Sequence, residues 1–288
     1  MIKMRRIYNA QKALAFISDL KLAGKTIGFT PTMGALHQGH YSLIELSKNE
    51  NDVTVSSIFV NPTQFNNTED LDKYPRTIEA DCKGLEEAGC DIVFLPTMDE
   101  IYPGGAAQFE VSLDLQGLDA KMEGAHRPGH FAGVVQVVKR LLDIVPATHL
   151  YMGQKDYQQF TIIRHMIREL TINTKLVVCP IIREDDGLAM SSRNRRLTKE
   201  HRDDASILFR VLSQAKEWIN HKSISEIETK AMEYLNIPGF KPEYFEIING
   251  HTLETIDHIN GVSEVVACTA VWAGEVRLID NIRLIVSD

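Results

Sequence analysis

The sequence has little of the features that mark several special classes of protein. Its 31 basic residues are outnumbered by 39 acidic ones, so the net charge is -8 and no overall positive field is available to hold a nucleic-acid backbone. Its four cysteines contain no C-x-x-C pair and are too few for a disulfide framework. We therefore predict no nucleic-acid partner and a reducing compartment, and any bound polyanion must be small and held locally.

Long apolar runs are also missing. No stretch approaches the roughly 18 residues needed to span a bilayer, and the opening M-I-K-M-R-R-I-Y-N-A has no sustained apolar core or small-residue cleavage site. These absences predict a cytoplasmic protein with no membrane partner. With 44% hydrophobic and 24% charged residues, the composition excludes a disordered or collagen-like chain. At about 150 residues per domain, the length predicts two domains.

Short apolar runs and helical patterns alternate over the first two thirds of the chain. We predict strands over 25–32, 53–60, 91–95, 149–152 and 175–182, with helices over 38–48, 77–88, 128–145 and 155–170. This alternation predicts an α/β fold built on a Rossmann-like parallel sheet. After a polar stretch from 183, helices over 199–220 and 223–235 precede strands over 244–248, 262–271 and 276–286. We predict a parallel-sheet domain over 1–184 and a smaller α+β domain over 185–288; the motifs described below imply that the first is a nucleotide-binding catalytic domain and the second a lid.

The segment P-T-M-G-A-L-H-Q-G-H, at 31–40, stands where the first predicted strand gives way to a helix. Open α/β sheets bind ligands beyond the carboxyl ends of their strands, and a helix N-terminus attracts anions. His37 and His40 are spaced to share one helical face, so both imidazoles can donate to one phosphoryl group. Two ordinary surface histidines are the alternative, but the preceding strand and the glycines favour a phosphate site.

Two further segments carry groups suited to phosphate. M-S-S-R-N, at 190–194, supplies two hydroxyls and a guanidinium that can close over β- and γ-phosphates. G-Q-K-D, at 153–156, follows a predicted strand, where Lys155 can point at phosphate or carboxylate. Taken alone, the first segment is more typical of a solvated linker. Lys155 is equally typical of a surface lysine at a helix start, and Asp156 is also a candidate N-cap.

Together these motifs resemble the nucleotidylyltransferase superfamily and, more closely, the pantothenate synthetase family of pantoate–beta-alanine ligases. The resemblance also rests on F-V-N-P-T-Q-F at 59–65, D-L-D-K-Y-P-R-T at 70–77, R-P-G-H-F-A-G-V at 127–134, G-Q-K-D-Y-Q-Q at 153–159 and R-E-D-D-G-L-A-M-S-S-R-N at 183–194. It implies an enzyme in which the carboxylate of pantoate attacks the α-phosphate of ATP and pyrophosphate leaves. The amine of beta-alanine then displaces AMP from pantoyl adenylate.

The resemblance implies four catalytic residues: His37, His40, Lys155 and Arg193. His40 matches the position that the family assigns as proton donor; we expect it to stabilise charge on the phosphoryl group as a protonated imidazole, and proton transfer stays open. ATP contacts are implied for Met33, Gly34, Ala35, Leu36, His37, Gln38, Gly39, His40, Gly153, Gln154, Lys155, Asp156, Ile182, Met190, Ser191, Ser192 and Arg193. Gln154 stands where many relatives have Glu, which affects the detail of those contacts.

Substrate contacts are implied for Gln64 and Gln159, with Asn61 and Tyr74 at the beta-alanine end. A glutamine amide can both donate to and accept from hydroxyl and carboxylate groups without a repelling charge. Pantoate, beta-alanine and ATP are the small-molecule partners, and the resemblance implies a homodimer. Two alternatives stay open: a nucleotidylyltransferase acting on a small phosphate ester, and a non-catalytic nucleotide-sensing module.

Metal binding is the least determined feature. Mg²⁺ is expected to arrive with ATP, held mainly by phosphate oxygens and water, so we predict no protein ligand for it beyond Asp81 as a guess. Glu123, His126 and His130 form E-x-x-H-x-x-x-H, which raises a structural zinc site. Pro128 and Gly129 interrupt that spacing and argue against a helical site of this kind.

Overall fold

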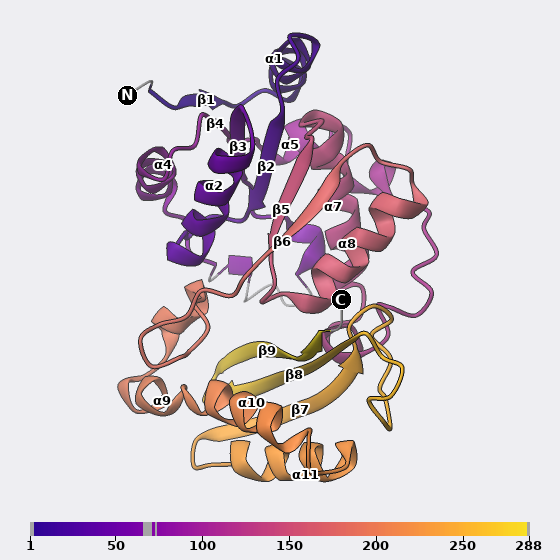
Figure 1. The fold of residues 1–288 in the computed structure, drawn as a ribbon. Coiled ribbons are helices and arrows are strands. Elements are labelled where there is room, and N and C mark those ends of the chain that lie inside the picture. The colour runs from indigo at the N-terminus through magenta and orange to yellow at the C-terminus, as the bar shows by residue number, and fades with distance from the viewer. Residues whose placement is uncertain (1–2, 66–70, 73, 287–288) are drawn as a thin grey trace. The chain divides into compact units, whose positions relative to one another are not determined.

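The computed structural model describes residues 3–65, 71–72 and 74–286 (Figure 1). Asp70 and Lys73 of the D-L-D-K-Y-P-R-T segment lie outside the described residues. The chain divides into two compact units. We call Met1–Gln154 with Gln159–Pro180 the amino-terminal unit, and Lys155–Gln158 with Ile181–Asp288 the carboxy-terminal unit.

The amino-terminal unit is built on a six-stranded sheet whose strand pairs are all parallel. Its strands are β1 (Arg5–Ile7), β2 (Ile27–Thr32), β3 (Val53–Ile58), β4 (Ile92–Phe94), β5 (His149–Gly153) and β6 (Lys175–Cys179). Its helices are α1 (Ala10–Leu22), α2 (Gln38–Glu50), α4 (Ile78–Glu87), α5 (Met98–Ile101), α6 (Met122–His126), α7 (His130–Ile144) and α8 (Tyr157–Glu169), and its 3-10 turns are η1 (Pro62–Gln64) and η2 (Ala106–Phe109). The first two residues of α8 are counted with the carboxy-terminal unit.

Both faces of this sheet are covered by helices. Figure 1 shows α2 and α4 on one face and α7 and α8 on the other. The side chains of Ile27 and Phe29 on β2 are fully buried, as is Val55 on β3. This burial explains why the strands read as continuous apolar runs rather than as alternating patterns. The predicted Rossmann-like parallel α/β fold is confirmed.

The strand order is β1-β4-β3-β2-β5-β6, so the chain changes direction across the sheet between β2 and β5. These two strands pair directly, with Gly28 opposite His149 and Phe29 opposite Leu150. At such a switch point the loops that follow the two strands diverge and leave a crevice at the carboxyl edge of the sheet. The loops after β2 and β5 are therefore where a ligand is expected.

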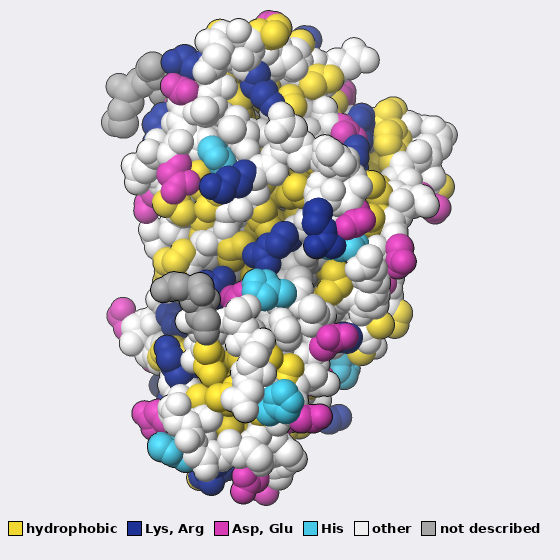
Figure 2. Space-filling model, turned by 45° about the vertical axis from the view of Figure 1, so that its right-hand side comes forward, with side chains coloured by type: hydrophobic (Ala, Val, Ile, Leu, Met, Phe, Trp, Pro, Cys, Tyr) yellow, Lys and Arg dark blue, Asp and Glu magenta, His cyan; other side chains and the backbone are white. Residues whose placement is uncertain are grey.

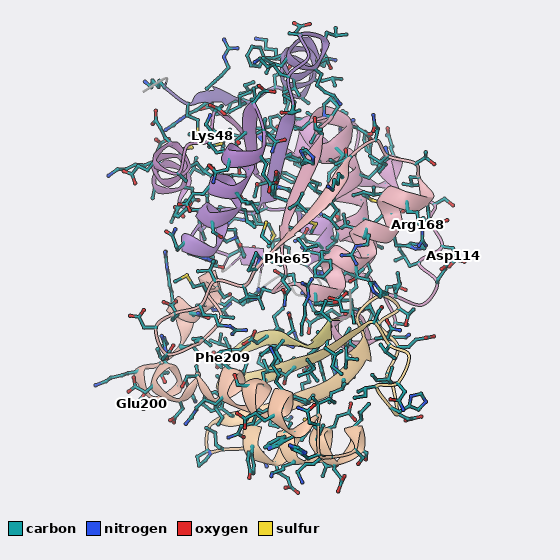
Figure 3. The ribbon with its side chains drawn as sticks, in the orientation of Figure 1. Lys48, Phe65, Asp114, Arg168, Glu200 and Phe209 are labelled. Carbon is teal, nitrogen blue, oxygen red and sulfur yellow. The ribbon has the colours of Figure 1, made fainter. Side chains whose placement is uncertain are left out.

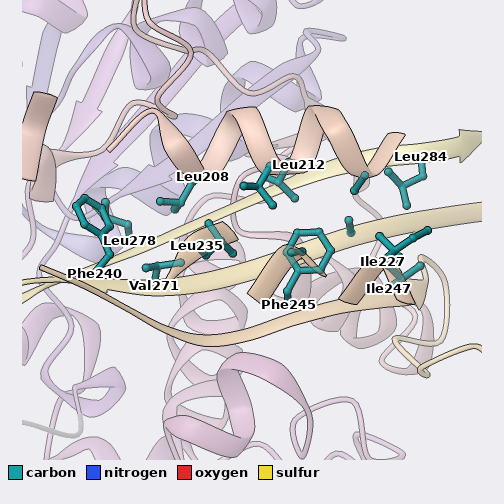
Figure 4. Close-up of a cluster of buried hydrophobic side chains, with 14 of the residues drawn as sticks. Leu208, Leu212, Ile227, Leu235, Phe240, Phe245, Ile247, Val271, Leu278 and Leu284 are labelled. Atoms are coloured by element: carbon teal, nitrogen blue, oxygen red, sulfur yellow. The ribbon is translucent and has the colours of Figure 1, made fainter. Parts of the chain in front are cut away.

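The carboxy-terminal unit is a three-stranded antiparallel sheet with helices, which confirms the predicted α+β character. Its elements are η3 (Ser192–Arg196), α9 (Lys199–Asp204), α10 (Ile207–Trp218), α11 (Ile224–Leu235), β7 (Phe240–Asn249), β8 (Glu264–Ala273) and β9 (Val276–Val286). Its core, drawn in Figure 4, packs Leu212 of α10 and Ile227 of α11 with Phe245, Ile247 and Val271 of the sheet. Burial of this apolar surface is the main contribution to the stability of the unit.

The structure corrects several element predictions. The first strand is β1, followed by α1, so the 31–40 segment follows the second strand. The helix predicted over 199–220 is two helices, because α9 is polar throughout and the apolar stripe that faces the sheet begins only with Ile207 and Leu208. The helix predicted from 128 begins at His130, because Gly129 has a left-handed backbone with φ of 80°.

On the face drawn in Figure 2, Lys and Arg side chains are interspersed with Asp, Glu and uncharged ones. In the part of the chain that the structure describes, no helix combines the length and apolar content needed to cross a membrane.

Candidate active site

The loop after β2 is held in an unusual backbone conformation by one buried carboxylate. Gly34 and Ala35 both have positive φ, 86° and 51°, and for Ala35 this left-handed conformation is strained. Asp81 on α4, only 2% exposed, accepts hydrogen bonds from the main-chain N–H of Ala35 at 3.0 Å and of Leu36 at 2.8 Å. The Thr77 hydroxyl donates to the same carboxylate at 3.1 Å. The loop backbone is therefore fixed before any ligand binds.

His37 and His40 form the start of α2 rather than a pair on its face. His37 is the N-cap, with Nδ1 accepting from Gly39 N at 3.2 Å, and His40 Nδ1 accepts from His37 N at 3.4 Å, which completes a capping box. The expectation of neighbouring positions on one helical face is corrected, because His37 has an extended backbone outside the helix. The ring centroids are nevertheless 4.1 Å apart.

The capping contacts assign the tautomers of both imidazoles. A main-chain N–H can only donate, so each Nδ1 is the unprotonated acceptor and each neutral ring carries its proton on Nε2. A second proton on either Nδ1 would break the capping bond. In this tautomer each ring has an Nε2–H donor at the N-terminus of a helix whose dipole attracts anions.

The loop after β5 lies at the same edge of the sheet. Gly153 ends β5, which pairs with β2, and Gln154 N donates to the carbonyl of Cys179 at the end of β6 at 2.8 Å. The topology thus brings Gly153 and Gln154 to the edge of the sheet that carries the Met33–His40 segment. Gln159 lies in the same unit, half-buried on α8.

The predicted substrate residues after β3 are buried and interlinked. Gln64 is 8% exposed, and its Nε2 contacts Met33 Sδ at 2.8 Å, which joins this segment to the loop after β2. Asn61, 1% exposed, donates through Nδ2 to the carbonyl of Gly133 at 3.2 Å and to Gln64 Oε1 at 3.4 Å. Tyr102 donates to Asn61 Oδ1 at 3.3 Å. Asn61 therefore orients Gln64 within this cluster.

Tyr74 is 8% exposed and packs edge-to-face on Phe65, labelled in Figure 3, with ring centroids 5.9 Å apart. Phe65 follows η1 directly, so Tyr74 lies against the end of the turn that carries Gln64.

His130 holds the main chain of Gln64 and had not been predicted to do so. A carbonyl can only accept, so His130 Nδ1 donates to Gln64 O at 2.7 Å, and Nε2 then accepts from the guanidinium of Arg127 at 3.2 Å. Both ring nitrogens of His130 are thus used by protein atoms. Among the described residues, no group of three or more His, Cys, Asp and Glu side chains is arranged to hold a metal ion. Both observations weigh against the zinc alternative.

The remaining predicted ATP contacts belong to the carboxy-terminal unit. The carbonyl of Lys155 accepts from Asn281 Nδ2 at 2.9 Å, and the exposed Asp156 stands immediately before α8. Met190 N donates to Ile182 O at 3.0 Å, so these two residues face each other across a hairpin. Ser191 caps η3 by accepting from Arg193 N at 3.3 Å. Lys155, Ile182 and Met190–Arg193 thus share one compact unit, while His37 and His40 lie in the other.

The network around these residues had no local sequence signal. Asp81 and Asn281 belong to no motif in the sequence, and only the fold brings them to the loops they hold. His130 lies in R-P-G-H-F-A-G-V, so the motif marked the residue without indicating its partner.

Comparison with known proteins gives one consistent result. A family model described as pantoate-beta-alanine ligase matches residues 5–283. A pantothenate synthetase from Bacteroides fragilis is 47% identical over 282 residues, which cover 97% of this chain and 99% of the relative. A pantothenate synthetase from Flavobacterium psychrophilum is 49% identical over 264 residues, 90% and 92% of the two chains.

Solved structures agree with the sequence relatives. The crystal structure of pantothenate synthetase from Thermus thermophilus matches with a TM-score of 0.91 and 39% identity, covering 98% of this chain and all of that one. The structure of pantoate-beta-alanine ligase from Francisella tularensis, complexed with beta-gamma ATP and beta-alanine, matches with a TM-score of 0.81 and 36% identity, covering 98% of both chains.

Proposed function

The chain belongs to the pantoate-beta-alanine ligase family, and from this membership we propose the following reaction and residue roles. The protein is an ATP-dependent acid–amine ligase that joins pantoate to beta-alanine and forms pantothenate, a step of coenzyme A biosynthesis. The observation that carries this function is the family likeness over nearly the whole chain. The geometry of the loops after β2, β3 and β5 supports the roles of individual residues.

The reaction consists of two displacements. A carboxylate oxygen of pantoate attacks the α-phosphorus of ATP, the bond to the β-phosphate bridging oxygen breaks, and pyrophosphate leaves. The neutral amine of beta-alanine then attacks the acyl carbon of pantoyl adenylate, the amide forms, and AMP leaves as the amine gives up a proton. In each step negative charge moves onto phosphate oxygens, so fixed hydrogen-bond donors aimed at those oxygens accelerate the reaction.

His37 and His40 supply such donors for the first step. Their Nδ1 atoms are occupied by main-chain N–H groups, so each ring meets phosphate through Nε2–H. We assign them to stabilising charge on the α-phosphoryl group and on the departing pyrophosphate. In this assignment neither ring needs a second proton, and His40 acts as a hydrogen-bond donor.

Gln64 and Gln159 bind pantoate, and Gln64 also contacts beta-alanine. The amide of Gln64 is oriented by Asn61, and its main chain is held by His130, so its direction is set in advance. Tyr74 and Asn61 border the beta-alanine end. Met33, Gly34, Ala35, Leu36, Gln38 and Gly39 complete the nucleotide contacts of the loop after β2, and Gly153 and Gln154 those of the loop after β5.

Lys155, Asp156, Ile182 and Met190–Arg193 are assigned to ATP from the carboxy-terminal unit. Lys155 and Arg193 supply positive charge for the phosphates, Ser191 and Ser192 supply hydroxyl donors, and Ile182 offers main-chain groups to adenine. Mg²⁺ enters with ATP as part of the substrate. Asp81 does not suit a role as its ligand, because both carboxylate oxygens already accept main-chain hydrogen bonds. We also propose a homodimer in the cytoplasm, and the four buried free cysteines are compatible with a reducing compartment.

Isotope exchange between pyrophosphate and ATP tests the function. We expect exchange only when pantoate is present, and release of AMP only when beta-alanine is added as well. Exchange driven by a small phosphate ester instead of pantoate would replace this function with that of another nucleotidylyltransferase. ATP binding without exchange for any acid or ester would favour a nucleotide-sensing module.

Two variants separate the capping role of the histidines from their role toward phosphate. His37→Ser gives S-x-x-H and His40→Gln gives H-x-x-Q; each replaces one imidazole by a side chain that can accept a capping hydrogen bond, so α2 keeps its start while that imidazole is lost. We expect each to lower the exchange rate by about 10²- to 10³-fold with little change in melting temperature. His149→Gln, which removes a histidine that contacts Asn51 near the start of β5, is the control and should retain exchange. Normal exchange in both capping variants would contradict the assignment.

A further inference from the structure

The carboxy-terminal unit contains a buried ion pair that the reaction does not use. Asp280 on β9 is 2% exposed and accepts from both terminal nitrogens of Arg183, at 2.6 and 3.0 Å. Arg183 also donates to the carbonyls of Gly187 at 3.0 Å and Asn281 at 3.3 Å. Its guanidinium carbon lies 4.2 Å from the ring centroid of Phe209 on α10, labelled in Figure 3. These contacts fix the guanidinium in one orientation.

Arg183 stands at the base of the hairpin that leads into Met190–Arg193. Its backbone bridges to Ala189, and Glu184 N donates to Leu188 O at 2.8 Å. At the turn, Gly187 has a φ of 94°, and a Cβ added there would lie 2.2 Å from the Phe209 ring. The hairpin is thus anchored to β9 through the ion pair and packs closely on α10. Its direction determines where the chain enters the segment 190–193.

The next residue of β9 reaches the other phosphate-directed segment. Asn281 is 2% exposed and donates through Nδ2 to the main-chain carbonyl of Lys155 at 2.9 Å. Its own N–H donates to Asp280 Oδ1 at 2.8 Å, which couples the two side chains. Consecutive residues of one strand therefore hold the main chain at Lys155 and, through Arg183, the hairpin before Met190.

We propose that Asp280 and Asn281 are positioning residues for ATP, which set the placement of Lys155 and of Met190–Arg193 toward the phosphates. This inference rests on the proposed nucleotide contacts of those two segments. A buried ion pair adds little net stability compared with apolar side chains of the same size, so its main effect here is to fix geometry. A displacement of about 1 Å at a reacting group can cost 10²-fold in rate, and long flexible side chains on loops need such support.

Two variants and a matched control test this role. Asn281→Ala removes the hydrogen bond from Nδ2 to the main-chain carbonyl of Lys155, and Asp280→Asn keeps the shape of the carboxylate but removes its charge. The control is Thr269→Val on β8, because Thr269 is paired with Asp280 in the sheet and its hydroxyl also donates to a main-chain carbonyl, that of Tyr244, at 2.8 Å. If Asp280→Asn does not fold, Asn281→Ala still carries the test.

ATP affinity is measured by calorimetry, and kcat and the KM values are measured in the ligase assay. We expect both variants to weaken ATP binding or lower kcat by about tenfold or more while the KM for beta-alanine stays within twofold, and Thr269→Val to stay within twofold in every value. The positioning role would be overturned if Asn281→Ala and Asp280→Asn changed ATP affinity and kcat no more than Thr269→Val does at the same loss of melting temperature. Wild-type protein that binds ATP but shows no pantoate-dependent exchange would overturn the proposed function instead, and the ATP affinities would still decide this inference.

Discussion

Replacing Asp81 is the most direct test of how the backbone of the loop after β2 is held in place. Its carboxylate accepts from the N–H groups of Ala35 and Leu36 and from Thr77, in a site that is 2% exposed. A buried main-chain N–H that loses its acceptor costs about 1–3 kcal/mol. Asp81→Asn keeps one acceptor oxygen but places an NH2 group opposite the other main-chain N–H, so it should lower the free energy of unfolding by about 1–3 kcal/mol. Asp81→Ala removes both acceptors and should cost about 2–6 kcal/mol.

Amide hydrogen exchange reports this loss locally, which matters because a chain of two units need not unfold in one step. A cost of about 1–3 kcal/mol corresponds to an increase of about 5- to 150-fold in the exchange rate of the Ala35 and Leu36 amides when the loop opens locally. Because the loop also carries His37, we expect the KM for ATP to rise with it. Asp91→Asn is the control, since Asp91 accepts from Thr54 N at 2.8 Å at the opposite end of the sheet.

Two results would refute this reasoning. Unchanged amide exchange and unchanged KM for ATP in Asp81→Asn would mean that the carboxylate does not hold the loop. A raised requirement for Mg²⁺ with unchanged amide exchange would mean instead that Asp81 is a metal ligand.

Three further predictions concern packing, thiols and pH. Gly133→Ala places a Cβ 2.4 Å from Thr63 O and 2.8 Å from Gln64 N, so it should destabilise the protein by about 1–3 kcal/mol and raise the KM for pantoate more than that for ATP; an equal rise in both would contradict it. Burial raises the pKa of Cys90 and of Cys179 to about 12, and all four thiols are buried, so a thiol reagent at pH 8 should label the native protein only slowly and label four sites after unfolding. Burial raises the pKa of Glu228, whose Oε1 accepts from Ile247 N at 2.8 Å. The folded state therefore favours the protonated carboxyl, and the free energy of unfolding decreases as pH rises through the folded pKa and the buried carboxyl ionises. Glu228→Gln, which keeps an acceptor oxygen, should then raise the melting temperature at pH 7 but not at pH 4, and an equal gain at both values would refute the assignment.

The parallel-sheet architecture could be predicted from the sequence because buried parallel strands appear as short continuous runs of apolar or small residues. Runs such as 53–58 are apolar or small throughout, and each predicted strand is present in the structure. β1 was missed because three residues, two of them arginines, show no period. The break between α9 and α10 was missed because Ala205 and Ser206 are not helix breakers; the break follows from which residues face the sheet.

In the candidate site too, the sequence predicts some residues and misses others. The residues that we propose to contact a ligand lie in motifs, so His37, His40, Gln64 and Lys155 could be named from the sequence. Residues that hold those groups contact them only across the fold: Asp81 lies 45 positions from Leu36, and Asn281 lies 126 from Lys155. Long-range hydrogen bonds of this kind leave no local pattern, so only a structure reveals them.

Because β2 lies between β3 and β5 in the sheet, it pairs with β3 before β5 has been synthesised. Ile27 N donates to Thr148 Oγ1, 121 residues further along the chain. At about 5–20 residues per second, β5 leaves the ribosome roughly 6–24 s after β2. Until then β2 has β3 on one side only and is an open edge. The nascent chain therefore carries the loop with His37 and His40 before β5 can pair with β2, so a ligand that needs the loops after both strands cannot bind until β5 has been made.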